Sequence, residues 1–346
     1  MIIKLVKQIL RVFYSLSFVN FFKFIRYYDS NAKQVLLLTR HWQNPSIEPL
    51  IWEILTICFF INNKIPFRLS FSRKGSSFKC CKVIWYPGVH FFKDDKDFSN
   101  RLISFASDLE KNNCEIYPSS HQISFLENKC FMYKQFSEKD ISHPKTVIVK
   151  KDVFDKTNPL EFPFLFKGEH SNSGKEVVLI PNEKEWLKFL KSDLFERSNS
   201  LIFQKLVDMR SDIRVLVVGD QIMNHYWRKN PHDDWRPTST NFGSYLDFSP
   251  LPENVVNASI SYLKKLGLIM GAYDITFEKN DIFSEPLVLE VSPLFSLNPM
   301  VDEGEIADYS KFKTKVFGKN AFWKSQIDQL SSISDVYLEL TGINNL

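Results

Sequence analysis

The first part of the chain alternates short apolar runs with amphipathic segments. The runs that are typical of buried strands lie at 34–39, 67–71, 82–86 and 114–118. Between them, residues 46–62 and 98–111 carry apolar residues at helical spacing, and Pro49 falls in the first turn of the earlier segment. Because strands that alternate with helices form parallel sheets, this region is predicted to be a small parallel α/β lobe.

The pattern changes after residue 127, where strands follow one another through short turns. A helix is predicted over 129–140, and a β-hairpin over 211–229 with its turn at Gly219 and Asp220. The other predicted elements are strands at 145–149, 162–167, 176–180 and 201–207 and a helix at 183–194. Two paired strands are predicted over 270–293. One carries Asp274, and the other carries Glu290 and Ser292 on one face, because they are two residues apart.

Residues 1–28 are both basic and apolar. Apolar side chains such as Leu5, Ile9 and Leu16 have helical spacing, and residues 1–40 contain seven Lys or Arg and one Asp, a net charge of +6. A basic amphipathic helix rich in Phe and Tyr is typical of an interfacial membrane anchor. A helix that packs on the protein's own core with its basic face in water also explains the pattern, so the sequence leaves both hypotheses open.

Length and composition are those of a globular protein. The 346 residues are enough for two or three domains or lobes, and 44% hydrophobic with 24% charged residues is an ordinary balance. The net charge of +4 does not indicate nucleic-acid binding. Five cysteines without metal-ligand spacing favour reduced thiols in a cytoplasmic protein. We expect neither a transmembrane helix nor a secretory signal, because no long uncharged apolar run or cleavage site is present.

Five short segments follow one another in a characteristic order. They read ENK at 127–129, FLFK at 164–167, IFQKLV at 202–207, DIRVLVVGDQ at 212–221 and LVLEVSP at 287–293. In this order the segments resemble the motifs of the ATP-grasp superfamily, and most of all its RimK-type carboxylate–amine ligases. The resemblance covers residues of roughly 115–300.

The resemblance implies a mixed α/β (α+β) fold, an ATP-grasp fold with an N-terminal small parallel α/β (pre-ATP-grasp) lobe. Residues 1–30 would be the basic amphipathic helix, 31–120 the pre-ATP-grasp domain and 121–346 the ATP-grasp domain. Within the last of these, the small lobe would lie at about 130–200, the large lobe at about 201–305 and a helical tail at 306–346.

ATP and Mg²⁺ are the cofactors that the resemblance implies. The phosphates of ATP need cations at spaced positions, and Lys129, Lys167 and Arg214 come from three different elements that could converge on them. Ser173 and Gly174 lie in the polar loop SNSGK, where backbone N–H groups can approach phosphate oxygens. The family has more glycines in this loop than the one found here.

The adenine and ribose would lie near the strand at 201–207. Gln204, Lys205 and Leu206 would frame the adenine, mostly through backbone groups. Asp208 follows this strand, where it either accepts hydrogen bonds from the ribose hydroxyls or is an ordinary loop acid.

Mg²⁺ prefers carboxylate and amide oxygens, which Asp274 and Glu290 would supply with a third donor. The family has Asn two residues after the Glu, whereas this chain has Ser292, so either Ser292 or Asn298 is expected to complete the set. Glu290 lies in a nearly continuous apolar run, which predicts a buried carboxylate. Because an unpaired buried carboxylate is costly, a metal partner is favoured.

The function that the resemblance implies is ATP-dependent ligation of a carboxylate to an amine or a related nucleophile through an acyl phosphate. Arg214 and Arg228 would stabilise the acyl phosphate, and Arg236 and Asn241 would hold the substrate carboxylate. The substrates expected are small-molecule, glycan or peptide carboxylates and amines, either in cell-surface glycan precursors at the inner membrane face or in peptide and amino-acid modification. Two alternatives remain: a nucleotide-binding regulator with little turnover, and an ATP-grasp kinase of a small molecule or carbohydrate.

Overall fold

The structure is a computed structural model. It describes residue 16 and residues 19–38, 47–72, 74–87, 98–126, 128–170, 176–231, 235–239, 242–297, 306–307 and 321–343. The chain divides into two compact units. Unit 1 comprises Met1–Leu126, Pro293–Met300 and Lys313–Leu346, and unit 2 comprises Glu127–Ser292 and Val301–Phe312.

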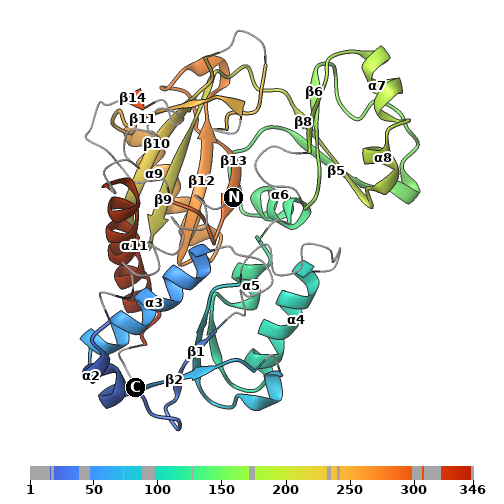
Figure 1. Cartoon of the computed structure of the whole chain (residues 1–346). Helices are drawn as coiled ribbons and strands as arrows, with labels where there is room; N and C mark the ends of the chain where they lie inside the picture. The colour runs from blue at the N-terminus through green and yellow to red at the C-terminus, as the bar shows by residue number, and fades with distance from the viewer. Residues whose placement is uncertain are drawn as a thin grey trace, which may run out of the picture. The chain divides into compact units, whose positions relative to one another are not determined.

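Unit 1 is built on a four-stranded parallel sheet in the order β2-β1-β3-β4 (Figure 1). Its strands are β1 (Gln34–Leu37), β2 (Phe67–Ser70), β3 (Lys82–Trp85) and β4 (Glu115–Tyr117), and its helices are α2 (Phe21–Tyr27), α3 (Ile47–Asn62), α4 (Phe98–Lys111), α5 (Ser120–Ile123) and α11 (Ala321–Leu340), with a short 3₁₀ turn at Gly75–Ser77. The predicted parallel α/β lobe is therefore confirmed.

The apolar runs of unit 1 form its core. One side of the sheet packs on α4 through a cluster that includes Val35, Val83, Trp85 and Leu109. The C-terminal helix α11 packs against α3. The domain boundary expected at residue 121 would group α11 with the second domain, but the structure groups it with unit 1, because its partner α3 belongs there.

The amino-terminal segment is interrupted at Asn20. The side chain of Asn20 accepts a hydrogen bond from the backbone N–H of Lys23 (3.1 Å) and so starts a new helix, α2. A single helix over residues 1–28 is therefore wrong at this point, although residues 1–15, 17 and 18 lie outside the described residues. None of the described helices is both long and apolar enough to span a bilayer.

Unit 2 contains two antiparallel sheets. The smaller has the order β5-β8-β6-β7, and helices α7 and α8 pack beside it (Figure 1). Its elements are α6 (Lys129–Glu138), β5 (Thr146–Lys150), a 3₁₀ turn (Lys151–Val153), β6 (Phe164–Lys167), β7 (Val177–Ile180), α7 (Glu183–Phe189), α8 (Asp193–Arg197) and β8 (Ser200–Lys205). The helix predicted over 183–194 is in fact two helices, because the Ser192 side chain caps a second one.

The larger sheet has six strands in the order β13-β12-β9-β10-β11-β14. Its elements are β9 (Ser211–Val218), β10 (Gln221–Lys229), β11 (Tyr245–Asp247), α9 (Glu253–Lys265), β12 (Met270–Thr276), a 3₁₀ turn (Glu278–Asn280), β13 (Leu287–Ser292) and β14 (Ile306–Ala307). Helix α9 packs on β9, β10 and β12. The predicted β9–β10 hairpin is confirmed, and Gly219 in its turn has a positive φ of 60° that favours glycine.

Candidate active site

A row of polar side chains crosses the larger sheet. Glu290 on β13 is the cross-strand partner of Asp274 on β12, Asp274 is the partner of Arg214 on β9, and Arg214 is the partner of Tyr226 on β10. Directly opposite residues in antiparallel strands project from the same face. The register therefore brings Glu290, Asp274 and Arg214, three of the predicted site residues, to one face of the sheet.

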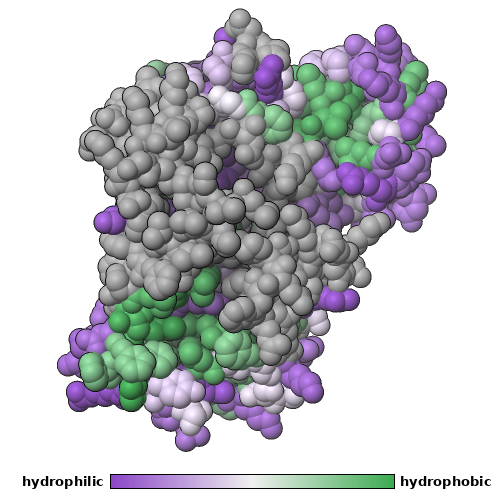
Figure 2. Space-filling model, viewed as in Figure 1, coloured by the Kyte–Doolittle hydropathy of each residue, from purple (hydrophilic) through white to green (hydrophobic). Residues whose placement is uncertain are grey.

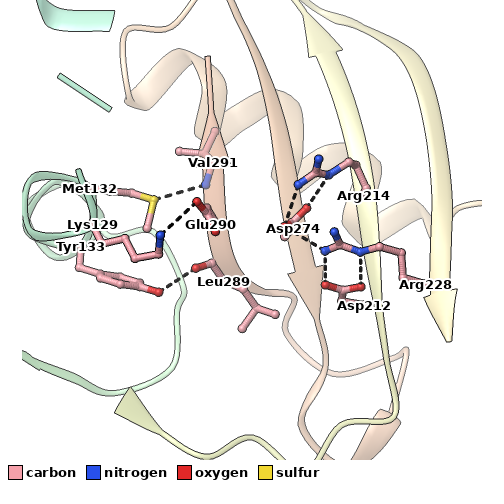
Figure 3. A network of polar contacts seen from close by, with 10 residues as sticks. All are labelled: Lys129, Met132, Tyr133, Asp212, Arg214, Arg228, Asp274, Leu289, Glu290 and Val291. Carbon is pink, nitrogen blue, oxygen red and sulfur yellow. Dashed lines mark hydrogen bonds and ion pairs between the residues drawn. The ribbon is translucent and has the colours of Figure 1, made fainter. Parts of the chain in front are cut away.

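Asp274 is held by two guanidinium groups. Arg214 donates from Nε to Oδ1 (2.8 Å) and from Nη2 to Oδ2 (2.9 Å), and Nη2 of Arg228 lies 2.9 Å from Oδ2 (Figure 3). Arg228 also makes a bidentate contact with Asp212, in which its Nε donates to Oδ1 at 2.8 Å. Two arginines and two aspartates thus form one continuous network on the sheet, in which both aspartates are buried.

The network keeps Asp274 and both arginines charged. Burial alone would raise the pKa of Asp274, but Arg214 and Arg228 outweigh it and hold that pKa well below its usual range. Burial disfavours both guanidinium charges, but the aspartates more than offset this and raise the pKa values of both arginines above their usual range. Asp274 is therefore ionised and fully paired in this structure.

The segment 235–239 contacts the network from the β10–β11 connection. The Thr238 side chain is buried and hydrogen-bonds to Asp212. Arg236, two residues earlier, is exposed. The structure therefore brings Arg214 and Arg228 together at Asp274 and leaves Arg236 near them in sequence but accessible to solvent.

Helix α6 covers the outer edge of β13. Lys129, Met132 and Tyr133 lie on one face of α6, and each contacts β13 (Figure 3). Lys129 Nζ lies 3.5 Å from Glu290 Oε1. Met132 Sδ accepts a hydrogen bond from the Val291 N–H (3.4 Å), and the Tyr133 hydroxyl donates one to the Leu289 carbonyl (2.8 Å). The asparagine side chain of Asn128 caps this helix. The result is an edge strand whose polar groups are satisfied by a helix.

Glu290 is less buried than its sequence predicts. Its side chain is 36% exposed, and the Lys129 ammonium, itself only 5% exposed, is beside it. The apolar run around it is misleading because β13 is the edge strand of the sheet, where only Val288 and Val291 are fully buried. The argument that burial of Glu290 requires a metal ion is therefore wrong.

Lys167 ends β6 and is buried. Its ammonium donates to the Tyr133 hydroxyl (3.0 Å), and burial lowers its pKa to about 8 although Glu290 and Asp274 act to raise it. The next residue, Gly168, lies close to Glu176, because a Cβ there would be 2.8 Å from the Glu176 Cβ. Lys129 and Lys167 thus come from α6 and β6 to the region of Glu290.

The residues expected around adenine lie at the end of β8. Gln204 is buried and donates to Thr146 Oγ1 (2.9 Å), while Lys205 is exposed and its ammonium bonds Glu278 (2.9 Å). Leu206 is half-buried directly after the strand, and Asp208 is exposed. Only Gln204 points into the same network as Lys167, since its side chain also hydrogen-bonds to Tyr133.

Ser292 ends β13, where it is half-buried, and its cross-strand partner is Ala272. Four predicted site residues lie outside the described residues: Ser173, Gly174, Asn241 and Asn298. Within the described part of the chain, no three His, Cys, Asp or Glu side chains form a ready metal site. Asp274 and Glu290 supply two carboxylates on adjacent strands.

Sequence reasoning missed Asp212, Tyr133 and Thr238. Asp212 and Arg214 are two residues apart in one strand, so the D-x-R spacing already places both side chains on one face. This signal could have identified Asp212. Tyr133 and Thr238 contact residues that are far away in sequence, and no local sequence pattern predicts such contacts.

Solved structures of similar fold include two ligases or synthetases and an ATP-grasp protein. D-alanine–D-alanine ligase from Bacillus anthracis matches with a TM-score of 0.53 and 14% identity over 90% of this chain and 99% of that chain. A RimK domain ATP-grasp protein from Sphaerobacter thermophilus matches with a TM-score of 0.51 and 12% identity over 88% and 99%. D-cycloserine synthetase DcsG matches with a TM-score of 0.53 and 13% identity over 86% and 99%. At these identities the likeness establishes the fold.

Comparison with curated proteins gave no match. Comparison with protein families matches residues 127–300 to the RimK-like ATP-grasp domain. The matched range contains the smaller sheet of unit 2, the larger sheet except β14, and every residue of the polar network described above. The chain belongs to the RimK-like ATP-grasp domain family.

Proposed function

We propose that the protein is a carboxylate–amine ligase that activates its carboxylate substrate as an acyl phosphate. As an ATP-grasp protein it is an enzyme that uses ATP and Mg²⁺ and forms ADP and phosphate. The observation that carries the proposal is the gathering of Lys129, Lys167, Asp274 and Glu290 from four elements of unit 2. These residues are far apart in the sequence and are brought together by the fold of unit 2.

The side chains fit a Mg–nucleotide. Two lysine ammonium groups match the phosphate charges, and the partly exposed carboxylate of Glu290 beside Asp274 offers the hard oxygen donors that Mg²⁺ prefers. Glu290 and Asp274 would hold the ion, with Ser292 or Asn298 as the third donor. When bound, Mg²⁺ neutralises phosphate charge and lowers the barrier to transfer of the terminal phosphoryl group.

The chain's own residues would orient the reactants. A carboxylate oxygen attacks the terminal phosphorus, and the bond to the leaving ADP oxygen breaks. The amine then adds to the acyl carbon, loses a proton and expels phosphate. Arg214 and Arg228 are already fixed and charged on the sheet face, so they would stabilise developing negative charge without rearrangement. Ser173, Gly174, Gln204, Lys205, Leu206 and Asp208 would hold the nucleotide, and Arg236 and Asn241 the substrate carboxylate.

Binding of Mg–ATP to Lys167→Ala tests the assignment of the site. The variant should lose most of the affinity measured by calorimetry, because a buried ammonium no longer faces the phosphates. Lys188→Ala on α7 is a matched control, since its ammonium is exposed and paired with Glu185. Unchanged affinity in folded Lys167→Ala would place the nucleotide elsewhere.

One observation favours a second candidate, a nucleotide-binding regulator. Asp274 is saturated by Arg214 and Arg228, so a metal ion must compete with two guanidinium groups for it. If the Arg214 and Arg228 guanidinium groups are not displaced from Asp274, the protein would bind nucleotide with little turnover. Nucleotide binding without phosphate release, over a broad set of carboxylates and amines, would support this candidate.

We also propose that the protein works at an anionic membrane surface, where glycan precursors with carboxylate groups would be accessible. The support is helix α2, whose Phe21, Phe22 and Ile25 side chains are 67%, 84% and 60% exposed. Figure 2 shows apolar side chains gathered over the region that Figure 1 labels α2 and α3. Exposed aromatic side chains next to basic ones are typical of helices that lie in the lipid interface.

The opposite face of α2 is attached to the domain. The Phe24 and Tyr28 rings lie 5.6 and 6.2 Å from the Phe67 ring on β2, measured between ring centroids. Lys23 and Arg26 flank the exposed apolar side chains. The helix is thus anchored on one side and presents apolar and basic groups on the other.

A further inference from the structure

The Tyr133 hydroxyl joins three elements of unit 2. It lies on α6, donates to the Leu289 carbonyl of β13 (2.8 Å) and accepts from the Lys167 ammonium of β6 (3.0 Å). The side chain is only 1% exposed, and Gln204 on β8 also hydrogen-bonds to the same hydroxyl. A buried hydroxyl with this many partners has one allowed orientation.

The Leu289 carbonyl that accepts from Tyr133 belongs to a β-bulge. The register passes from Asp274–Glu290 to Ile275–Val288, so Leu289 has no partner on β12. Its carbonyl is the acceptor for Tyr133. A hydroxyl has one hydrogen, and because that hydrogen is given to Leu289, the lone pairs of the oxygen are left for the Lys167 ammonium.

The arrangement fixes the position of a buried cation. Among the residues that the structure describes, the Tyr133 oxygen is the only hydrogen-bond acceptor of the Lys167 ammonium. Leu289 is next to Glu290, so the hydrogen-bonded chain from Lys167 through Tyr133 to Leu289 ends beside the acidic pair Asp274 and Glu290.

We propose that Tyr133 is a positioning residue, which holds the Lys167 ammonium beside Asp274 and Glu290 before nucleotide binds. It acts through Lys167 and need not touch the nucleotide. The inference rests on the proposed function, because it assigns Lys167 to the nucleotide phosphates. It predicts that the Tyr133 hydroxyl matters for nucleotide affinity only while Lys167 is present.

A double-mutant cycle tests this prediction. ADP affinity is measured for the wild type, Tyr133→Phe, Lys167→Met and the double variant, by calorimetry and by the ADP-dependent rise in Tm, which also detects weak binding. Tyr133→Phe should bind ADP about tenfold more weakly than the wild type, as expected for a lost hydrogen bond to a charged group. In the Lys167→Met background the same change should have no further effect.

Tyr273→Phe is the matched control. Tyr273 is fully buried on β12, and its hydroxyl has no hydrogen-bond partner in the described structure. This variant should bind ADP as the wild type does. Equal weakening by Tyr133→Phe in both backgrounds would show a general structural role and overturn the inference, as would no weakening in either. If the wild type itself does not bind ADP, the proposed function fails first, and the two failures are distinguishable.

Discussion

Asp274 and Glu290 are cross-strand partners on β12 and β13, yet their side chains have different surroundings. Asp274 is buried and bonded to two arginines, whereas Glu290 is partly exposed beside one lysine. One carboxylate of the pair is therefore enclosed by cations, and the other is partly open to solvent. Asp274 fixes the positions of the arginines, and Glu290 is the carboxylate that a ligand can reach.

This difference predicts that the two carboxylates contribute unequally to the free energy of unfolding. Asp274→Asn leaves two buried guanidinium groups with too few negative partners and should lower the free energy of unfolding by about 3–5 kcal/mol. Glu290→Gln should lower it by about 1 kcal/mol or less, because its carboxylate is partly in water. Urea unfolding of both variants measures this. A larger loss for Glu290→Gln than for Asp274→Asn would contradict the assignment.

The stability conferred by Asp274 should depend on pH in a defined direction. Its pKa in the folded protein lies below the value of about 4 in the unfolded chain, so its contribution is fully present above that pH. As the pH falls below about 4, the contribution is lost. The stability difference between wild type and Asp274→Asn should therefore shrink on acidification, and urea unfolding at a series of pH values can follow it. A constant difference would argue against an ionised, paired Asp274.

Nucleotide affinity should also change with pH, through Lys167. Burial lowers the pKa of this ammonium to about 8, so its charge is lost as the pH rises through that value. ATP affinity should fall over the same range, measured by calorimetry from pH 7 to about pH 9.5. Lys167→Arg keeps its charge and should remove this dependence. If ATP affinity falls with rising pH in Lys167→Arg as it does in the wild type, the titration of another group causes the fall.

Vesicle binding tests the role of α2. Replacing Phe21 and Phe22 with Ser should release the protein from anionic vesicles, since two largely exposed aromatic side chains no longer enter the lipid interface. Leu187→Ser, a change at an exposed apolar position of α7, is the control. Binding should also weaken with salt. If the wild type never sediments with anionic vesicles, or if the double variant binds as well as the wild type, the membrane proposal fails.

The third magnesium ligand can be identified by substitution. Ser292→Ala and Asn298→Ala each remove one candidate oxygen donor, and the true ligand should raise the Mg²⁺ concentration needed for half-maximal ATP turnover. The other variant should have the requirement of the wild type. An unchanged Mg²⁺ requirement in both would exclude both residues and point to water as the remaining ligand.

Most of the secondary structure was predictable because its signals are local. The β9–β10 hairpin follows from two alternating runs around Gly219, and β1 to β4 follow from short apolar runs between amphipathic helices. The break before α2 also had a local signal that the sequence analysis missed, since Asn20 is a preferred helix-capping residue. The spacing of apolar residues alone did not indicate this break in the helix.

The partners of the site residues were less predictable. An apolar run suggested that Glu290 is buried, but the sequence does not show that β13 is the edge strand of its sheet or that α6 covers that edge. The saturation of Asp274 by Arg214 and Arg228 is likewise a contact between distant strands. Strand order and side-chain pairing depend on tertiary packing, which single-residue patterns do not encode.

Phosphate release in the presence of Mg–ATP tests the central claim most directly. A matrix of carboxylates and amines, including uronic acids, amino acids and peptides, is screened for phosphate, and each positive pair is examined by product mass spectrometry. The proposed ligase predicts phosphate release that requires both a carboxylate and an amine, with a product whose mass equals that of the two substrates minus one water. Glu290→Gln should remove this activity while remaining folded. Transfer of the phosphoryl group to a stable product without phosphate release would contradict the proposal and identify a kinase.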